Sequence, residues 1–361
     1  FQKKIYFRNK IRYNRGCIVR RDDMAAKDLL IPKYYENKLD IISTEIAIKY
    51  VKDLFERRLA HHLNLMRISA PLYVRKSSGL NDDLNGIERP VDFDIKEIKD
   101  EDIEIVHSLA KWKRMALKRY NMNIGKGIYT DMNAIRRDEV LDNLHSTYVD
   151  QWDWEKIIDE KSRNVEFLKM TVRNIMKALK ETEKELDIVF ENLEPFIQED
   201  VYFITSQELE DRYPDLTPKQ REYEITKQYK TVFIMQIGDV LKSGQKHDGR
   251  APDYDDWALN GDILLYYPIL DCPIEISSMG IRVNKQSLQE QLKKAGCEER
   301  LQLPFHQMLM NDELPLTIGG GIGQSRICLI LLNKAHIGEV QVSQWDDEMV
   351  KVCEEHHITL L

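Results

Sequence analysis

The order of helical and extended patterns along this chain restricts the folds that it can adopt. Two long amphipathic helices are predicted over residues 44–65 and 163–192, because apolar side chains recur in both at spacings of three and four residues. Thr44 is a suitable N-cap for the first helix. Helices that stand apart from clustered strands indicate an α+β fold with helices flanking a mixed sheet, and they argue against alternating βαβ units. The runs with strand character are IEIVHSLA, STYVDQWDW, VYFIT, TVFIMQIG, DILLYYPIL and PIEISSMGIRV.

Three details refine this pattern. Residues 68–74, ISAPLYV, contain Pro71, which has no N–H for a ladder, so they predict an edge or interface strand. The last two apolar runs meet at 271–273, Asp-Cys-Pro, which predicts a hairpin corner. In YVDQWDW, alternation places Gln151 and Asp153 on one face of a strand and Asp150 and Trp152 on the other. We expect Trp152 and Trp154 to fill the core.

Charge and composition exclude several classes of protein. The 361 residues include 53 basic and 61 acidic ones, for a formal net charge of −8. This balance argues against nucleic-acid binding over the whole surface, and no apolar run reaches the roughly 18 residues of a membrane helix. The cysteines are scattered without a CxxC pair, so we expect reduced thiols in a cytoplasmic enzyme. They are Cys17, Cys272, Cys297, Cys328 and Cys353.

The first 21 residues carry eight Lys or Arg and no acid. Their charge resembles that of an organelle transit segment, but they contain no serine. The alternative is that Met24 is the true start of the protein. On either interpretation we expect residues 1–35 to be a basic arm outside the fold, and residues 36–361 to form a single domain.

The strongest local motif is a glycine-rich run, Gly319 to Arg326, followed by the apolar run ICLILL. Glycines let a flat base or a sugar approach the backbone closely, and an arginine beside them can hold a phosphate or stack on adenine. Neither GxGxxG nor GxxxxGK[ST] fits this run. The structural alternative is a tight turn that enters a core helix.

Two further groups of charges could bind a nucleotide. Arg136 is followed by Glu139, and such a pair near a strand end could bind a phosphate and an exocyclic amine. Farther along, the acids of DYDDW (253–257), Asp262 and Glu275 precede Arg282. Carboxylates near an arginine suit Mg²⁺ that bridges polyphosphate oxygens, although each acid alone is more often a turn cap or a surface charge.

Together these elements resemble the three motifs of class II aminoacyl-tRNA synthetases. The helix with ISAPLYV resembles the dimer-forming first motif, Arg136 with its acids resembles the second, and Gly319 to Arg326 resembles the third. The second motif departs from the usual Arg-x-Glu, because Arg136 reaches Glu139 by Arg-x-x-Glu. Longer blocks are similar to one family of this superfamily, the ammonia-dependent asparagine synthetases or aspartate–ammonia ligases. These blocks are HSLAKWKR, LHSTYVDQWDWE, SQELEDRYPDL, RAPDYDDW, LNGDIL, SSMGIRV and TIGGGIGQSR.

The resemblance implies a class II synthetase-like domain with a largely antiparallel sheet, and a homodimer that needs neither nucleic acid nor a membrane. It implies that L-aspartate and ammonia are joined while ATP is cleaved to AMP and pyrophosphate, through β-aspartyl adenylate. The implied catalytic residues are Asp82, as the base for ammonia, with Arg136 at the α-phosphate, Gln151, and Arg326 at the γ-phosphate or on adenine. The implied substrate pocket contains Ser108, Lys113, Gln151, Asp153, Ser278 and Arg282. The implied ATP site contains Arg136, Glu139, Arg250, Asp255, Gly321, Gly323 and Arg326, with Asp262 and Glu275 for Mg²⁺.

Two rival hypotheses remain. An aminoacyl-tRNA synthetase would need a tRNA-reading module, commonly a barrel of about a hundred residues, and no segment of this chain has room for one. A catalytically inactive paralogue is the second rival. The loss of a motif arginine or of a metal carboxylate would favour it, but Arg136, Arg326, Asp262 and Glu275 are all present.

Overall fold

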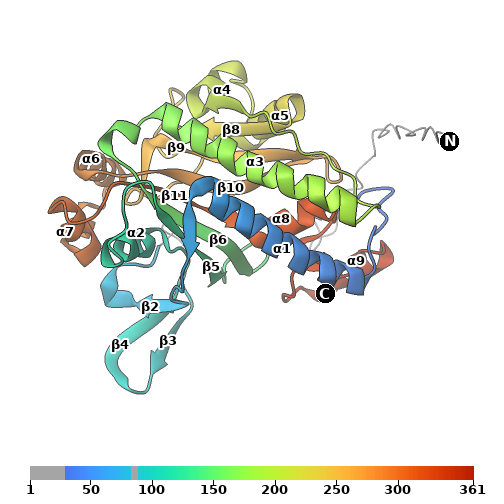
Figure 1. Cartoon of the computed structure of the whole chain (residues 1–361), viewed down its shortest axis with the longest axis horizontal. Helices are drawn as coiled ribbons and strands as arrows, with labels where there is room; N and C mark the ends of the chain where they lie inside the picture. The colour runs from blue at the N-terminus through green and yellow to red at the C-terminus, as the bar shows by residue number, and fades with distance from the viewer. Residues whose placement is uncertain (1–28, 83–87) are drawn as a thin grey trace, which may run out of the picture.

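A computed structural model describes residues 29–82 and 88–361 of the chain (Figure 1). Its centre is an eight-stranded sheet in which β1–β5 and β7–β8, the outermost pairs, are parallel and the other pairs are antiparallel. This arrangement confirms the predicted α+β fold with a mixed, largely antiparallel sheet. In spatial order the strands are β1 (Leu65–Arg67), β5 (Gly127–Ile135), β6 (Tyr148–Ile157), β11 (Thr317–Gly323), β10 (Cys272–Arg282), β9 (Asp255–Tyr267), β8 (Thr231–Met235) and β7 (Tyr202–Thr205).

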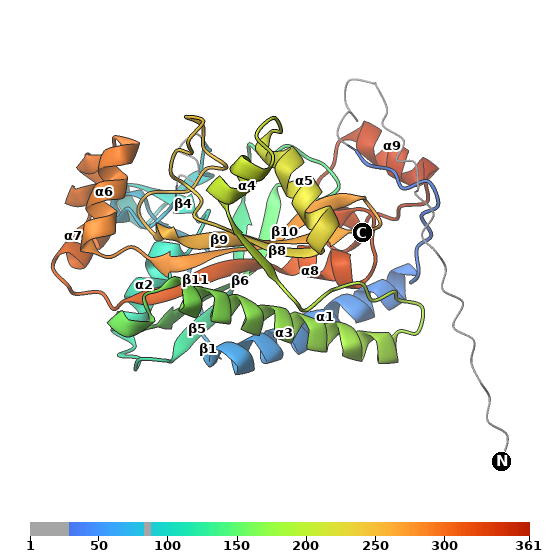
Figure 2. The same ribbon diagram turned by 90° about the horizontal axis from the view of Figure 1, so that it is seen from above.

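The two long helices cover one face of this sheet, as Figure 2 shows. They are α1 (Ile41–Leu63) and α3 (Val165–Val189), and their apolar faces join the main core with residues such as Trp152 and Trp154 of β6. The N-cap of α1 is Asp40, whose side chain accepts a hydrogen bond from the Ser43 backbone N–H. The expectation that Thr44 caps this helix is therefore wrong. Thr44 lies within the first turns, because Asp40 offers an earlier cap.

The opposite face of the sheet is covered in part by α4 (Ser206–Arg212) and α5 (Pro218–Tyr229). A second apolar cluster joins these helices to alternate side chains of β8, such as Val232 and Ile234. The remaining helices are α2 (Ala110–Arg119), α6 (Lys285–Ala295), α7 (Pro304–Met310), α8 (Gln324–Leu331) and α9 (Asp347–Glu355), with short 3₁₀ turns at η1 (Lys76–Ser78), η2 (Glu160–Ser162), η3 (Glu298–Gln302) and η4 (Ile337–Glu339).

A small three-stranded sheet projects from the body, with β4 (Ile98–Ile105) between β2 (Tyr73–Arg75) and β3 (Asp92–Ile95). The predicted strand over residues 68–74 is replaced by β1 and β2, which flank Pro71. Proline has no N–H to donate and leaves a break between the two pairings. The run IEIVHSLA is a strand only as far as Ile105, and its end leads into α2.

The boundary predicted at residue 36 is too late. Leu29 and Ile31 are 4% and 6% exposed and belong to the main core, and the Tyr35 hydroxyl donates to Glu339 Oε1 at 2.7 Å. Apolar burial therefore fixes these residues against the body of the protein. The basic run 1–21 and Met24 lie outside the described residues. In the part that the structure describes, no helix is long and apolar enough to cross a membrane, and the four cysteines described are free thiols.

Two predictions about the strands are confirmed. Strands β9 and β10 form the predicted antiparallel hairpin, although its turn lies over residues 268–271, and Cys272 and Pro273 already belong to β10. Along β6, Trp152 and Trp154 are fully buried beneath α1 and α3. Gln151 and Asp153 point to the opposite face of the sheet, as the alternation of side chains requires.

Candidate active site

A cavity of about 450 Å³ opens on the face of the sheet opposite α1 and α3. Strands β6, β10 and β11 form its floor, and α5 and the loop before β9 contribute to its walls. The structure thus brings together residues that are far apart in the sequence. Of the residues proposed from the resemblance, those that line the cavity are Ser108, Lys113, Arg136, Glu139, Gln151, Asp153, Arg250, Asp255, Glu275, Ser278, Arg282, Gly321, Gly323 and Arg326.

A fully buried lysine lies at one end of the cavity. Lys113, on α2, forms an ion pair with Asp153 of β6, and its Nζ also donates to the Trp154 carbonyl at 2.9 Å. Burial lowers the pKa of Lys113 and raises the pKa of Asp153, because both charges have lost their water. The attraction between the two opposite charges opposes this effect of burial, and the amine of Lys113 and the carboxyl group of Asp153 lie side by side.

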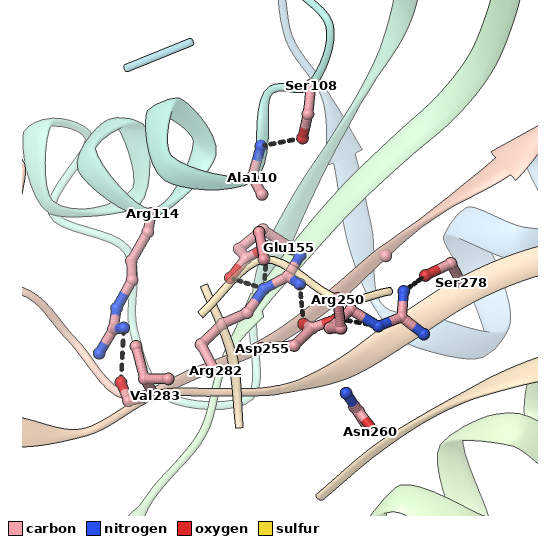
Figure 3. Close-up of polar contacts among 12 residues, drawn as sticks. Ser108, Ala110, Arg114, Glu155, Arg250, Asp255, Asn260, Ser278, Arg282 and Val283 are labelled. Carbon is pink, nitrogen blue, oxygen red and sulfur yellow. Dashed lines mark hydrogen bonds and ion pairs between the residues drawn. The ribbon is translucent and has the colours of Figure 1, made fainter. Parts of the chain in front are cut away.

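Arg282 of β10 connects Glu155 of β6 with Asp255 at the start of β9 (Figure 3). Its Nε and Nη2 donate to Glu155, with the Nη2–Oε2 distance at 2.7 Å, and its Nη1 donates to Asp255. Burial lowers the pKa of Arg282, but the two carboxylates outweigh burial and raise it overall. A guanidinium has five N–H donors, so one hydrogen on each Nη remains for a ligand.

The glycine run has a steric role in β11. A Cβ on Gly319 would lie 1.9 Å from Glu155 Oε2, and a Cβ on Gly321 would lie 2.2 Å from Gln151 Oε1. The side chains of β6 cross over β11 where its glycines leave room. The run is therefore neither a phosphate loop nor a simple turn, but a strand that makes space for the polar side chains of its neighbour.

Arg250 joins three acceptors on the wall beside β9 and β10. It donates to Ser278, and its Nε lies 3.8 Å from Asp255 Oδ2 (Figure 3). It also donates to Asp262. Asp262 stands behind this arginine and is not among the residues that line the cavity. Its pKa is raised to about 7, because burial and the like charge of Glu275 outweigh the attraction of Arg250. Asp262 and Glu275 are therefore close enough for their charges to repel.

The two motif arginines approach the cavity from different elements of the fold. Arg326 lies in the first turn of α8 and donates from Nη1 to the Glu275 backbone carbonyl at 2.9 Å, so it lies beside Glu275. Arg136 follows β5, and its Nη1 is 3.8 Å from Glu139 Oε2. Arg136 Nε is buried and has no hydrogen-bond partner among the described residues. This arginine thus has donors available to an anion in the cavity.

Asp82 lies next to the cavity but is not among its lining residues. It is 3% exposed, and its backbone carbonyl accepts a hydrogen bond from His107 Nδ1 at 3.1 Å. Burial raises the pKa of Tyr254 well above its usual value, and the charge of Asp82 raises it further. His107 and Tyr254 both line the cavity, so Asp82 lies directly beside two of its lining residues.

The acids of DYDDW act as ion-pair partners and do not form a metal cluster. Asp253 is within 3.3 Å of Lys111 and 3.0 Å of His306, Asp255 pairs with Arg282, and Asp256 pairs with Arg163. Among the described residues, no group of three or more His, Cys, Asp or Glu side chains could hold a metal ion by itself. Of the acids considered from the sequence, Asp262 and Glu275 remain the candidates for a shared cation.

Sequence reasoning missed several residues that line the cavity, notably Arg89, His107, Lys219, Asp248 and Tyr254. Arg89 donates to Asp138 through both Nε and Nη2 and holds the segment after Arg136. The blocks that carried the resemblance contain His107 and Tyr254, so a signal existed for these two. Lys219 follows Pro218 at the start of a helix, and nothing local to it indicates a site.

Comparisons of the sequence with known proteins point to one family. A family model described as aspartate-ammonia ligase matches residues 42–357. A protein of Clostridium perfringens strain SM101 named aspartate–ammonia ligase is 63% identical, with 92% of this chain and 99% of that protein covered. Proteins of the same name from Ruminiclostridium cellulolyticum and Lactobacillus johnsonii are 62% and 60% identical, again over 92% of this chain and 99% of each protein.

The chain also resembles solved structures, and at their low sequence identity this resemblance concerns the fold only. Asparaginyl-tRNA synthetase of Entamoeba histolytica, in complex with asparaginyl-adenylate, superposes with a TM-score of 0.60 at 13% identity, over 83% of this chain and 66% of that one. The enzyme from Pyrococcus horikoshii, complexed with the same adenylate, gives a TM-score of 0.60 at 12% identity, over 82% and 68% of the two chains. The fold is that of class II aminoacyl-tRNA synthetases, as predicted.

Proposed function

The chain belongs to the aspartate–ammonia ligase family, and we propose that it forms L-asparagine from L-aspartate and ammonia while ATP is cleaved to AMP and pyrophosphate. The observation that carries this proposal is the division of the cavity into two ends. One end holds the Lys113–Asp153 pair and Arg282, which suit the charges of an amino acid. The other holds Arg326 beside Asp262 and Glu275, which suits a polyphosphate with a cation.

In the first step, a side-chain oxygen of aspartate attacks the α-phosphorus of ATP. A new O–P bond forms as the bond to pyrophosphate breaks, and the product is β-aspartyl adenylate. Arg136 would hold the α-phosphate, because it has a buried donor without a partner among the described residues. Arg326 would hold the γ-phosphate or stack on adenine. Fixed positive charges of this kind stabilise the charge that develops in the transition state.

Other cavity residues would hold the two substrates in line. We assign Arg250, Asp255, Glu139, Gly321 and Gly323 to the nucleotide. The aspartate would be bound by residues at the opposite end of the cavity, with its ammonium group near Asp153 and its carboxylates near Lys113 and Arg282. The remaining residues of this group are Ser108, Gln151 and Ser278. Holding the reacting atoms in contact and in the right orientation accounts for a large part of an enzyme's rate acceleration.

In the second step, the nitrogen of ammonia attacks the activated carbonyl carbon. A C–N bond forms, the bond from carbon to the phosphate oxygen breaks, and AMP leaves. Ammonium cannot attack because its lone pair is protonated, so a base has to take a proton. We assign this role to Asp82, which is buried beside His107 and Tyr254 on the cavity wall.

The carboxylates present fit a magnesium ion. Asp262 and Glu275 repel each other, and Mg²⁺ favours one or two protein carboxylates together with phosphate oxygens. These two residues would hold the ion, which would neutralise charge on the leaving pyrophosphate. Arg250 neutralises Asp262 in the structure and would have to share it with the ion.

We also propose that the protein is a homodimer. Beyond the end of α1, Met66, Leu72 and Tyr73 are 52%, 50% and 46% exposed, and they surround Pro71. Strand β1 is the last strand at its end of the main sheet, so one of its edges faces outward in the described structure. Clustered exposed apolar side chains and an open strand edge together favour a second copy of this chain.

A pyrophosphate-release assay tests the proposed function. With ATP and aspartate, the protein should release pyrophosphate, and adding ammonium should sustain the release and yield asparagine and AMP. The Arg136→Ala variant should lose adenylation by about 100-fold. No asparagine in the presence of all three substrates would contradict the proposal, and aspartylation of tRNA would favour the synthetase hypothesis.

A further inference from the structure

Lys219 lies at the polyphosphate end of the cavity, although none of the roles assigned above uses it. It is the one residue of α5 that lines the cavity, whereas Ile225 of the same helix packs in the apolar cluster with Val232 and Ile234 of β8. Figure 2 shows α5 above the strands that carry Asp262 and Glu275. Lys219 therefore reaches the cavity from the helix that covers these strands, whereas Arg326 reaches it from α8, the helix that follows β11.

Three carboxylates surround the ammonium group of Lys219. Its Nζ lies 3.2 Å from Glu222 Oε2 and 3.4 Å from Asp248 Oδ2, and Glu275 is near enough to act on its charge. Partial loss of water lowers the pKa of Lys219, but the carboxylates outweigh this effect and raise it overall. The amine therefore stays charged at neutral pH and remains a permanent cation.

The position of this charge is unfavourable for α5 itself. Thr217 caps the helix and Pro218 occupies its first turn, with no acid in that turn. A cation at a helix N-terminus is repelled by the helix dipole. The side chain of Lys219 is 72% exposed, so its ion pairs with Glu222 and Asp248 contribute little to the stability of the protein. The stability of α5 therefore does not explain why a lysine occupies position 219. A negatively charged ligand in the cavity explains it better.

We propose that Lys219 binds the β- and γ-phosphates of ATP, and the pyrophosphate released from it, from the wall opposite Arg326. This inference rests on the proposed function, in which Arg326, Asp262 and Glu275 mark the polyphosphate end. The phosphates replace Glu222 and Asp248 as the partners of the ammonium. Lys219 makes no contact with the α-phosphate, adenosine or aspartate, because those groups lie toward Arg136 and Lys113.

Nucleotide binding by the full chain tests this role without any reaction. In calorimetric titrations with Mg²⁺, Lys219→Met should weaken ATP and pyrophosphate binding about tenfold and leave AMP affinity unchanged. The loss of one charge-assisted contact is of this size. Lys219→Arg should restore most of the ATP affinity. Lys227→Met is the matched control, because Lys227 lies on the same helix and pairs with Asp271, away from the cavity.

Two results of these titrations would contradict the proposed role of Lys219. Equal weakening of ATP and AMP binding would overturn the inference, since it would place Lys219 near the nucleoside or make it structural. Unchanged ATP and pyrophosphate affinities would overturn it as well. The wild-type protein, tested in parallel for asparagine formation, separates this result from failure of the proposed function. If asparagine forms but Lys219→Met binds ATP normally, only the role of Lys219 is wrong.

Discussion

Asp82 separates the two proposed half-reactions at the level of a single side chain. Asp82→Asn keeps the shape of the residue and removes its basicity, so aspartate-dependent ATP–pyrophosphate exchange should persist. Asparagine formation should fall about 100-fold, the usual scale for the loss of a general base. The two rates can be measured on the same preparation, with Asp92→Asn, an exposed acid of β3, as the control.

A pH series extends this experiment. Free ammonia rises about tenfold per pH unit below its own pKa, so the Asp82→Asn variant should recover part of its asparagine output between pH 6 and pH 9. Equal loss of both half-reactions would instead mean that Asp82 orients aspartate or the adenylate. Intact exchange without recovery at high pH would indicate that it positions ammonia and takes no proton.

Among the helices and strands, β11 is the one whose packing depends most on having glycine at particular positions. Gly319→Ala would place a methyl group within 1.9 Å of Glu155 Oε2 and disturb the buried pair of Glu155 with Arg282. We expect the free energy of unfolding to fall by about 3 kcal/mol, the scale for disturbing a buried ion pair. Urea denaturation measures the loss. Gly323→Ala is the comparison, because its Cβ would meet Arg326 atoms at 3.3 Å or more, and an equal loss in both variants would contradict this explanation.

The 3₁₀ turn η4 should respond to acid through its cap. His336 Nδ1 accepts a hydrogen bond from the Gly338 N–H at 3.0 Å, and burial lowers the pKa of His336 to about 4. The unfolded chain takes up this proton below about pH 6.5, whereas the folded chain resists it until about pH 4. Stability from this residue is therefore complete above pH 6.5 and declines as the pH falls toward 4, by up to about 3 kcal/mol.

The acid response of η4 is measured as a difference between two proteins. Glu339, in the same turn, has a pKa raised mainly by burial, and its contribution to stability changes with the opposite sign. Urea midpoints of the wild-type protein and His336→Asn should therefore be compared at pH 7.0, 5.5 and 4.5. Asparagine can still accept from the Gly338 N–H but does not titrate, so the variant should lose less stability in acid. Parallel pH profiles would refute the role of His336.

For the whole molecule, the proposed homodimer predicts the mass of the protein in solution and a substitution that should disrupt the interface. Light scattering at micromolar concentration should give about twice the 42.6 kDa of one chain. Leu72→Glu should shift the protein toward the monomer, because a charge would be buried between the copies. Ile188→Glu changes another exposed apolar residue, 77% exposed on α3, and should leave the mass unchanged. A wild-type monomer that forms asparagine at full rate would contradict the dimer.

The sequence by itself determined the elements and the orientation of their side chains. Periodicity predicted α1 and α3, and alternation in β6 placed Gln151 and Asp153 opposite Trp152, because these patterns depend only on local backbone geometry. The family could also be identified from the sequence, because the long characteristic segments and their order along the chain can be compared without knowing which residues are in contact. Local signals were weaker at the ends of elements, since the sequence predicted Thr44 as the cap of α1 whereas Asp40 is the cap in the structure.

Only the tertiary structure decided which charges meet. Arg282 pairs with Glu155, 127 residues away, and Lys113 pairs with Asp153 on another element, and no local pattern encodes such partners. The same holds for Lys219, whose helix start carries no sign of the cavity that it lines, and for Leu29 and Ile31, which pack in the core next to a basic run. Burial and long-range electrostatics are properties of the assembled sheet and its layers, so they arise when the chain folds.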